Sequence, residues 1–265
     1  MSIDVRNLRR VVTVSGAVAT TVQAVTAVVA MRRGRRDYAD GVWGPGLAAI
    51  AFASAALGNG DAKRRWLLAA TTAGWAIRLE VLMMDRLRGT DEEDARYTEF
   101  LDGDSTVTVL AKVFVTQAIA QVLVSAPIQV AAASPLPRTA RRWLFPVGMA
   151  TMIAGAVVEA TADRQKARFT ERDRDERPEV LDTGLWGWSR HPNYFGDSLV
   201  WDGVWIASAA SAPAGWTAAA PALMNYLLIY ATGAKRTERN LQEQAAYRDY
   251  QKRVSFFLPL PARNT

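Results

Sequence analysis

The sequence predicts an all-α integral membrane protein built as a seven-transmembrane helix bundle. Half of the 265 residues are hydrophobic, yet the mean hydropathy is close to zero, because long apolar runs alternate with highly charged connectors. Seven such runs can be distinguished along the chain. Runs of this kind, separated by charge, are typical of helices that cross a bilayer.

The first apolar run, Val11–Met31, contains no charged residue and, at about 1.5 Å per residue, is long enough to cross a hydrocarbon core of about 30 Å. Arg32 and Arg33 follow it at once, so we expect it to remain as a span and not to be removed as a signal peptide. The six later runs are Gly41–Gly58, Trp66–Met84, Ser105–Ser134, Trp143–Ala162, Phe195–Ser211 and Trp216–Gly233.

The alternative to a membrane bundle is a soluble all-helical protein with buried core helices. Apolar runs of about 10 to 14 residues would favour that alternative. The first, fourth and fifth runs here reach about 20 residues or more, which favours the membrane. The second and sixth runs are short, and the third and sixth contain charged residues. The boundaries of these three predicted spans are therefore the least sharply defined.

Basic residues are distributed unequally between the connectors on the two sides of this bundle. One set of connectors, with the C-terminal tail, carries 21 lysines and arginines, whereas the other set carries nine. The positive-inside rule then places the N-terminus outside the cell and the C-terminus in the cytoplasm. The net charge of +6 therefore indicates topology, and no nucleic-acid partner is expected.

The absence of cysteine excludes disulfides, thiolate catalysis and sulfur-ligated metals, and a single histidine excludes a multi-histidine metal site. That histidine, His191, lies in the segment GLWGWSRHPNYFGD, between a charged connector and an apolar run. Arg190, His191, Asn193 and Tyr194 there offer a cation, a titratable ring, an amide and a phenol. Because Pro192 fixes its own φ, we expect them to project from a rigid turn and not from a regular helix. The cluster indicates a charged cofactor.

Ionisable residues also occur inside or beside the apolar runs, where they usually mark a functional site. Glu159 and Asp163 are four positions apart and so share one helix face. The other members of this group are Arg78, Glu80, Asp197 and Asp202. The alternative is that these side chains pair with arginines at helix ends. Arginines bracket the histidine segment and can hold phosphate oxygens in bidentate fashion.

The chain resembles the bacterial branch of the steroid 5α-reductase family of membrane oxidoreductases. The matching stretches are EATADRQKARF (Glu159–Phe169), DTGLWGWSRHPNYFGDSLVWDG (Asp182–Gly203) and YRDYQKRVSFFLPLP (Tyr247–Pro261). The RHP-x-Y-x-G turn within the second stretch is also found in isoprenylcysteine carboxyl methyltransferases. The resemblance departs in the N-terminal half, where Trp75 falls at the position of a family tyrosine, and Asp197 follows Gly196 where the branch reads glutamate.

The resemblance implies a single domain over residues 1–265 with a cofactor pocket at its cytosolic end. Residues 10–133 would form the substrate side and residues 141–265 the cofactor-binding half. The expected reaction is reduction of an enone in a sterol-like or lipid molecule from the bilayer, by hydride transfer from NADPH. Nothing in the sequence requires more than a monomer.

The residues that the resemblance implies for cofactor binding are Glu159, Asp163, Arg168, Trp188, Arg190, His191, Asn193, Tyr194, Arg239, Asn240 and Tyr250. The nearest candidates for the catalytic acid are Asp40 and Glu80, with Arg78 as a partner. Two alternatives remain open: an S-adenosylmethionine-dependent methyltransferase acting on a lipid or prenylated substrate, and a lipid-binding membrane protein without catalysis.

Overall fold

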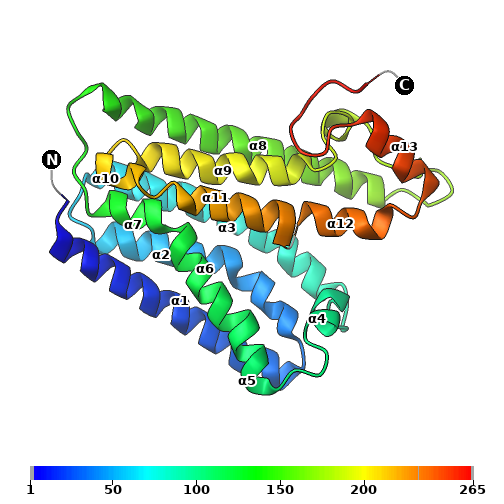
Figure 1. The fold of residues 1–265 in the computed structure, drawn as a ribbon, viewed down its shortest axis with the longest axis horizontal. Helices are drawn as coiled ribbons and strands as arrows, with labels where there is room; N and C mark the ends of the chain where they lie inside the picture. Colours follow the sequence, from blue (N-terminus) through cyan, green and yellow to red (C-terminus); the bar gives the residue numbers. More distant parts are fainter. Residues whose placement is uncertain (1–2, 232, 264–265) are drawn as a thin grey trace. The chain divides into compact units, whose positions relative to one another are not determined.

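The computed structural model describes residues 3–231 and 233–263, and in these ranges the regular secondary structure is entirely helical (Figure 1). The chain divides into two compact units. Unit 1 comprises Met1–Phe145 and Ser208–Ala220, and unit 2 comprises Pro146–Ala207 and Pro221–Thr265. The expectation of an all-α fold is therefore confirmed for the described residues.

Unit 1 is built on three long apolar helices, of which α2 packs against both α1 and α3. The side chain of Asp4 caps α1 and that of Asp61 caps α3, each accepting a hydrogen bond from a main-chain N–H of the first turn. Gly34 ends α1 in the left-handed conformation at φ 68°. The helices of this unit are α1 (Val5–Arg33), η1 (Arg36–Val42), α2 (Trp43–Leu57), α3 (Ala62–Arg88), α4 (Ala95–Phe100), α5 (Thr106–Val109), η2 (Leu110–Val115), α6 (Thr116–Val124), α7 (Ala126–Ala132), η3 (Ala140–Trp143) and α10 (Ala212–Gly215).

Unit 2 contains two long helices, α8 (Leu144–Thr170) and α9 (Pro192–Ser208), which lie side by side in Figure 1. Their contact is made by glycines, because a Cβ on Gly155 would lie 2.6 Å from the carbonyl oxygen of Gly196. A Cβ on Gly203 would lie 2.7 Å from the carbonyl oxygen of Gly148. In lipid no hydrophobic driving force brings helices together, and small residues let two helix backbones approach closely enough for van der Waals packing to hold them.

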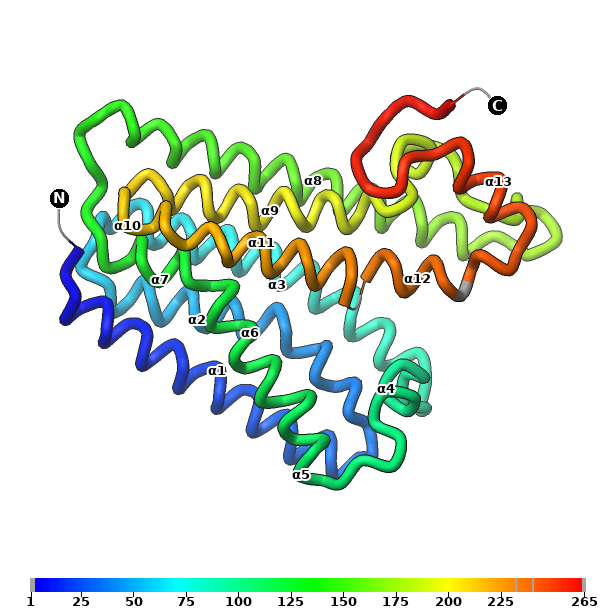
Figure 2. Tube along the Cα trace, in the orientation of Figure 1, coloured from blue at the N-terminus to red at the C-terminus, as the bar shows by residue number. Residues whose placement is uncertain are grey.

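The C-terminal part of unit 2 returns to the start of α9. It consists of α11 (Ala219–Tyr226), η5 (Leu227–Ala231), α12 (Ala234–Leu241) and α13 (Ala245–Arg253), followed by a non-helical segment. Figure 2 shows this last segment, in red, beside the yellow-green chain that precedes α9. Main-chain bonds join the two, from Arg190 N to Ser255 O and from Leu260 N to Trp188 O, both 2.9 Å.

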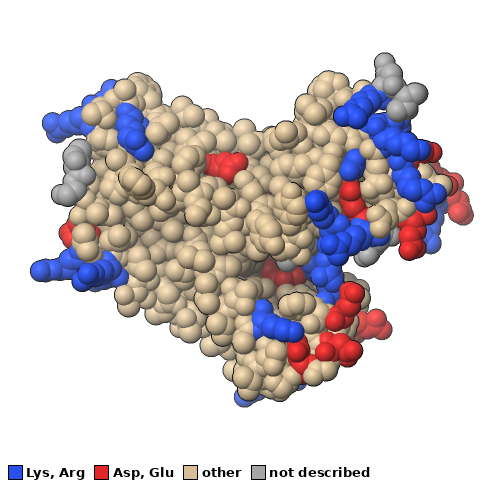
Figure 3. All heavy atoms as spheres, viewed as in Figure 1, with Lys and Arg blue, Asp and Glu red and all other residues tan. Residues whose placement is uncertain are grey.

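Within the described residues, five helical stretches are long and apolar enough to cross a membrane. They are Val5–Arg33, Arg36–Leu57, Ala62–Arg88, Thr106–Val124 and Ala140–Thr170. Charged side chains on the face seen in Figure 3 lie mainly toward helix ends, as expected for such segments.

The first five predicted spans correspond to these stretches, whereas the sixth and seventh are not confirmed. The sixth predicted span, Phe195–Ser211, corresponds to α9, whose 17 residues extend only about 25 Å and include Asp197 and Asp202. The seventh, Trp216–Gly233, begins in a turn and becomes helical only over Ala219–Ala231, while Thr232 lies outside the described residues.

The fourth predicted span, Ser105–Ser134, is also not one continuous helix. It breaks at Ser125, after α6, and resumes as α7 with Pro127 in its first turn. The proline ring disfavours a helical residue before it and removes one donor. At the break, the carbonyl of Gln121 accepts hydrogen bonds from both the hydroxyl of Ser125, at 2.6 Å, and its main-chain N–H, at 3.1 Å.

Candidate functional site

The histidine segment of unit 2 is a turn only as far as His191. Pro192 is the first residue of α9, so Asn193 and Tyr194 lie in a regular helix, contrary to the expected turn. Proline is favoured at the first helical position because its missing N–H has no partner there anyway. His191 is 3% exposed, and its ring packs edge-on against Phe256 at 5.2 Å between centroids.

Glu238, on α12, is the carboxylate on which this segment and the tail converge. It accepts hydrogen bonds from Arg190 Nε at 2.6 Å and from His191 Nε2 at 3.2 Å. Tyr247 Oη at 3.3 Å and Gln251 Nε2 at 3.1 Å donate from α13. Burial alone would raise the pKa of Glu238, but the hydrogen bonds from His191 and Arg190 together outweigh it and hold the pKa at about 2. Four donors thus share one ionised group.

The protonation of His191 follows from the same geometry. Burial lowers its pKa, and the hydrogen bond to Glu238 offsets only part of that effect, so the imidazole is neutral at pH 7. An ionised carboxylate can only accept, so Nε2 carries the proton of the neutral ring. His191 therefore acts as a donor within the protein.

Arg190 is committed to the protein by the same contacts. Its NH1 group donates to the carbonyls of Gln251 at 2.9 Å and Val254 at 2.8 Å, in addition to its ion pair with Glu238. The hydroxyl of Tyr250 is likewise used internally, donating to Trp186 O at 2.6 Å. Arg190, His191 and Tyr250 therefore hold the tail against the segment before α9.

Asn193 has a different arrangement. Its Nδ2 donates to Asp163 Oδ1 of α8 at 3.2 Å, whereas its Oδ1 is buried without a hydrogen-bond partner. Because a carboxylate only accepts, Asp163 fixes the amide with its nitrogen toward α8 and its oxygen away. Ser198 of α9, 3% exposed, also has a buried hydroxyl without a hydrogen-bond partner. Glu159 and Asp197 are buried on the same two helices.

We call Glu159, Asp163, Asn193, Asp197 and Ser198 the α8–α9 polar layer. In this layer, Asn193 Oδ1 has no hydrogen-bond donor within the protein and can accept a hydrogen bond from an amide or amine group of a ligand. Among the described residues no group of three or more His, Asp or Glu side chains is arranged to hold a metal ion.

The remaining predicted cofactor residues are not among the five that define this layer. Arg168 is exposed in the last turn of α8, Arg239 is exposed on α12, and Trp188 is 52% exposed. Tyr194 is half-buried, with its ring 5.9 Å from that of His191. Asn240 belongs to α12, and its side chain lies outside the described part of the structure.

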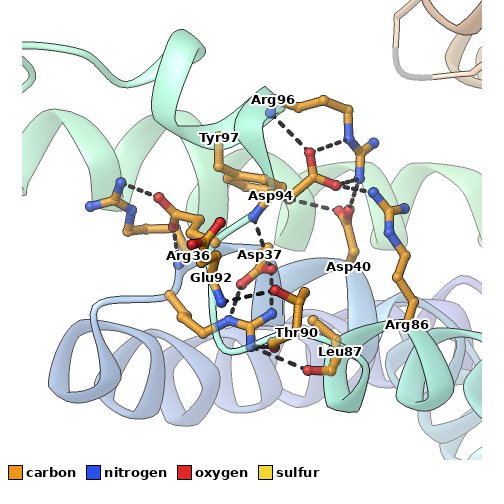
Figure 4. A network of polar contacts seen from close by, with 12 residues as sticks. Arg36, Asp37, Asp40, Arg86, Leu87, Thr90, Glu92, Asp94, Arg96 and Tyr97 are labelled. Atoms are coloured by element: carbon orange, nitrogen blue, oxygen red, sulfur yellow. Dashed lines mark hydrogen bonds and ion pairs between the residues drawn. The ribbon is translucent and has the colours of Figure 1, made fainter.

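Asp40, the acid predicted in the N-terminal half, lies in a network of charged side chains in unit 1 (Figure 4). Its carboxylate accepts hydrogen bonds from Tyr97 Oη at 2.6 Å and from Arg96 NH2 at 2.9 Å. Burial raises the pKa of Tyr97, and the charge of Asp40 raises it further, so the phenol stays protonated and donates. The pair joins η1 to α4.

Other ion pairs surround this pair. Arg35 binds Asp37 at 2.8 Å, Arg96 also binds Asp94 at 3.0 Å, Arg86 contacts Asp94, and Arg36 contacts Glu93. A small hollow here is lined by Asp37, Asp40, Met83, Arg86, Leu87, Asp94 and Arg96. Arg78 and Glu80, the other two residues predicted with Asp40, lie earlier in α3 and do not line this hollow.

Tyr97, Arg96 and Glu238 were not predicted from the sequence. Tyr97 and Asp40 are 57 positions apart, and Glu238 and His191 are 47 positions apart, so no local spacing links them. The only available signal was the crowding of charge at the ends of the apolar runs.

The chain belongs to the family described as "Protein of unknown function (DUF1295)", whose model matches residues 26–254. No curated protein and no solved structure matches the chain significantly. The family match covers both the charged network of unit 1 and the polar layer of unit 2.

Proposed function

We propose that this member of the DUF1295 family is a membrane oxidoreductase that reduces an activated C=C bond, an enone, in a sterol-like or lipid substrate. The proposed hydride donor is NADPH, bound by unit 2. In the proposed orientation the N-terminus is outside and the C-terminus is in the cytoplasm, as the distribution of basic residues favours.

The observation that carries the proposal is the amide of Asn193. Asp163 holds its nitrogen, which leaves a buried oxygen that lacks a donor. The carboxamide N–H of a nicotinamide is a donor of the required kind, and Asn193 lies in the RHPNYFG string that resembles the reductase family. NADPH, when bound, supplies the hydride. Asn193 would orient the cofactor, and Asp163 would orient Asn193.

The cofactor assignment predicts that NADPH raises the thermal unfolding temperature of the detergent-solubilised protein. A ligand at 100 times its Kd stabilises the folded state by about 2.7 kcal/mol. Asn193→Ala should weaken NADPH binding about tenfold, because one hydrogen bond to the ligand is lost. The measurement is the NADPH concentration that gives the half-maximal shift. Stabilisation by S-adenosylmethionine in place of NADPH would assign methyl transfer instead.

A matched control exists on α11. Asn225 donates its Nδ2 to Asp202 Oδ1 at 3.3 Å and also has a buried oxygen without a hydrogen-bond partner. Asn225→Ala should lower the unfolding temperature about as much as Asn193→Ala but leave the NADPH response unchanged. If the two variants lose NADPH affinity equally, or neither loses it, Asn193 is not a cofactor ligand.

A further inference from the structure

The segment after α13 presents an exposed apolar surface that lies outside every candidate span. Leu258 and Leu260 are 58% and 51% exposed, and Trp188 is 52% exposed. The main-chain bond from Leu260 N to Trp188 O, 2.9 Å, places the three residues on adjoining stretches of chain. We call Trp188, Leu258 and Leu260 the tail patch.

The tail patch is held firmly and is not a loose end. Ser189 Oγ donates to Phe257 O at 2.7 Å, and the ring of Phe257 packs edge-on against Phe195 of α9 at 5.8 Å. Phe257 and Pro259 are partly buried, whereas Leu258 and Leu260 between and beyond them are exposed. The two leucines and the tryptophan are therefore held in fixed positions with their side chains exposed at the protein surface.

The charge of the residues around the tail patch indicates which kind of surface the patch contacts. From Lys235 to Arg263 the tail has seven basic and three acidic residues. Arg263 N donates to the main-chain carbonyl of Arg253 at 2.9 Å, which places Arg263 beside Arg253, whose side chain pairs with Asp182 at 3.0 Å. Figure 3 shows basic side chains gathered at the C-terminal end of the chain. An apolar surface beside excess positive charge is complementary to an anionic bilayer, and tryptophan is enriched at the level of the headgroups.

The sequence of the patch also argues against pairing with another chain as a β-strand. Pro259 and Pro261 have no N–H to donate to a neighbouring strand. Leu260 N, between them, is already used by Trp188 O. A lipid surface needs no main-chain donors from the segment.

We propose that the tail patch inserts into the boundary between headgroups and acyl chains of an anionic bilayer, and so anchors the C-terminal segment of unit 2 to the membrane. The anchor is separate from the candidate spans and does not depend on the proposed reaction. It would hold in place the segment on which the contacts of Arg190 with Gln251, Val254 and Ser255 depend.

The test uses single cysteines, since the chain has none of its own. The variants Leu258→Cys and Leu260→Cys are labelled with an environment-sensitive fluorophore and reconstituted at low protein density in vesicles of phosphatidylcholine and phosphatidylglycerol. The expected result is quenching by nitroxide carried near the top of the acyl chains and protection from aqueous iodide. The positive control is Val157→Cys, because Val157 lies in the α8 span and is 60% exposed.

The negative control is Lys252→Cys, because the Lys252 side chain is 69% exposed and pairs with Asp249 three positions before it. Labels at 258 and 260 that behave like the label at 252 would overturn the proposal. Protection that appears only at high protein density, together with energy transfer between copies, would also overturn it, because it would assign the patch to self-association. Circular dichroism of each labelled variant verifies that the helices are intact.

Discussion

Replacing Gly155 by alanine should destabilise unit 2 by about 3 kcal/mol, at the upper end of the usual cost of overpacking. The added Cβ would lie 2.6 Å from the carbonyl oxygen of Gly196 and 2.7 Å from the main-chain nitrogen of Val200. Both atoms belong to the α9 backbone, which cannot rotate aside as a flexible side chain does. The helices must separate, and the contacts along their length weaken together. The measurement is thermal unfolding of the solubilised protein.

The control for Gly155→Ala is Gly74→Ala in α3, where a new Cβ would meet no atom within 4 Å. That change should be neutral or stabilising by up to about 1 kcal/mol, since alanine favours helix over glycine. Gly196→Ala should reproduce the loss at Gly155, because its Cβ would lie 2.7 Å from Gly155 O. The double variant should lose less than the sum, since one separation of the helices relieves both clashes. An unchanged unfolding temperature for both single variants would show that α8 and α9 do not pack this closely.

The glycine contact was present in the sequence as a pattern. Gly148 and Gly155 are seven positions apart, as are Gly196 and Gly203, so each pair lies on nearly one face of its helix. The sequence does not state which two helices meet, because that depends on the fold of the whole unit. The pattern indicates a close helix contact, and the structure supplies the partner.

The apolar runs were predictable because crossing a bilayer requires about 20 apolar residues in one stretch. This rule succeeds for the run Val11–Met31, which lies inside α1. It gives only part of the run Ser105–Ser134, of which Thr106–Val124 is a candidate span, because composition alone does not reveal that the helix breaks at Ser125. The run Trp216–Gly233 is not confirmed as a span, because the described helix begins only at Ala219 and Thr232 lies outside the described residues.

Part of the candidate site was predicted through the resemblance and not through spacing. Asp163 of α8 and Asn193 of α9 are 30 positions apart, and both were predicted for the same site. Asp40 was predicted as an acid, but its partners Arg96 and Tyr97 were not. Long-range pairs of this kind are chosen by the fold among many charges of the same type, so a single sequence leaves them undetermined.

Replacing Glu238 by glutamine should release the tail from the segment before α9. The Arg190 guanidinium, whose side chain is 11% exposed, would lose its only ion-pair partner in the described structure, and His191 would lose an ionised acceptor. Breaking a fully buried pair costs about 3 to 5 kcal/mol, and about 2 kcal/mol is reasonable here because the Glu238 side chain keeps 14% exposure. Hydrogen exchange of the Arg190 and Leu260 amides, corrected for intrinsic rates, should therefore accelerate about 30-fold.

The same variant also tests the direction of the pH dependence. The pKa of Glu238 is lowered to about 2, so its contribution is complete above the ordinary value of 4.5 and is lost as the pH falls toward 2. Burial lowers the pKa of His191 as well, so its contribution is complete above 6.5 and declines as the pH falls below that value. Protection of the two amides should thus decline in two steps on acidification, and Glu238→Gln should abolish only the lower one. Glu243→Gln, on an exposed residue of the same tail, should leave both steps in place. Two unchanged steps in Glu238→Gln would mean that other contacts hold the tail.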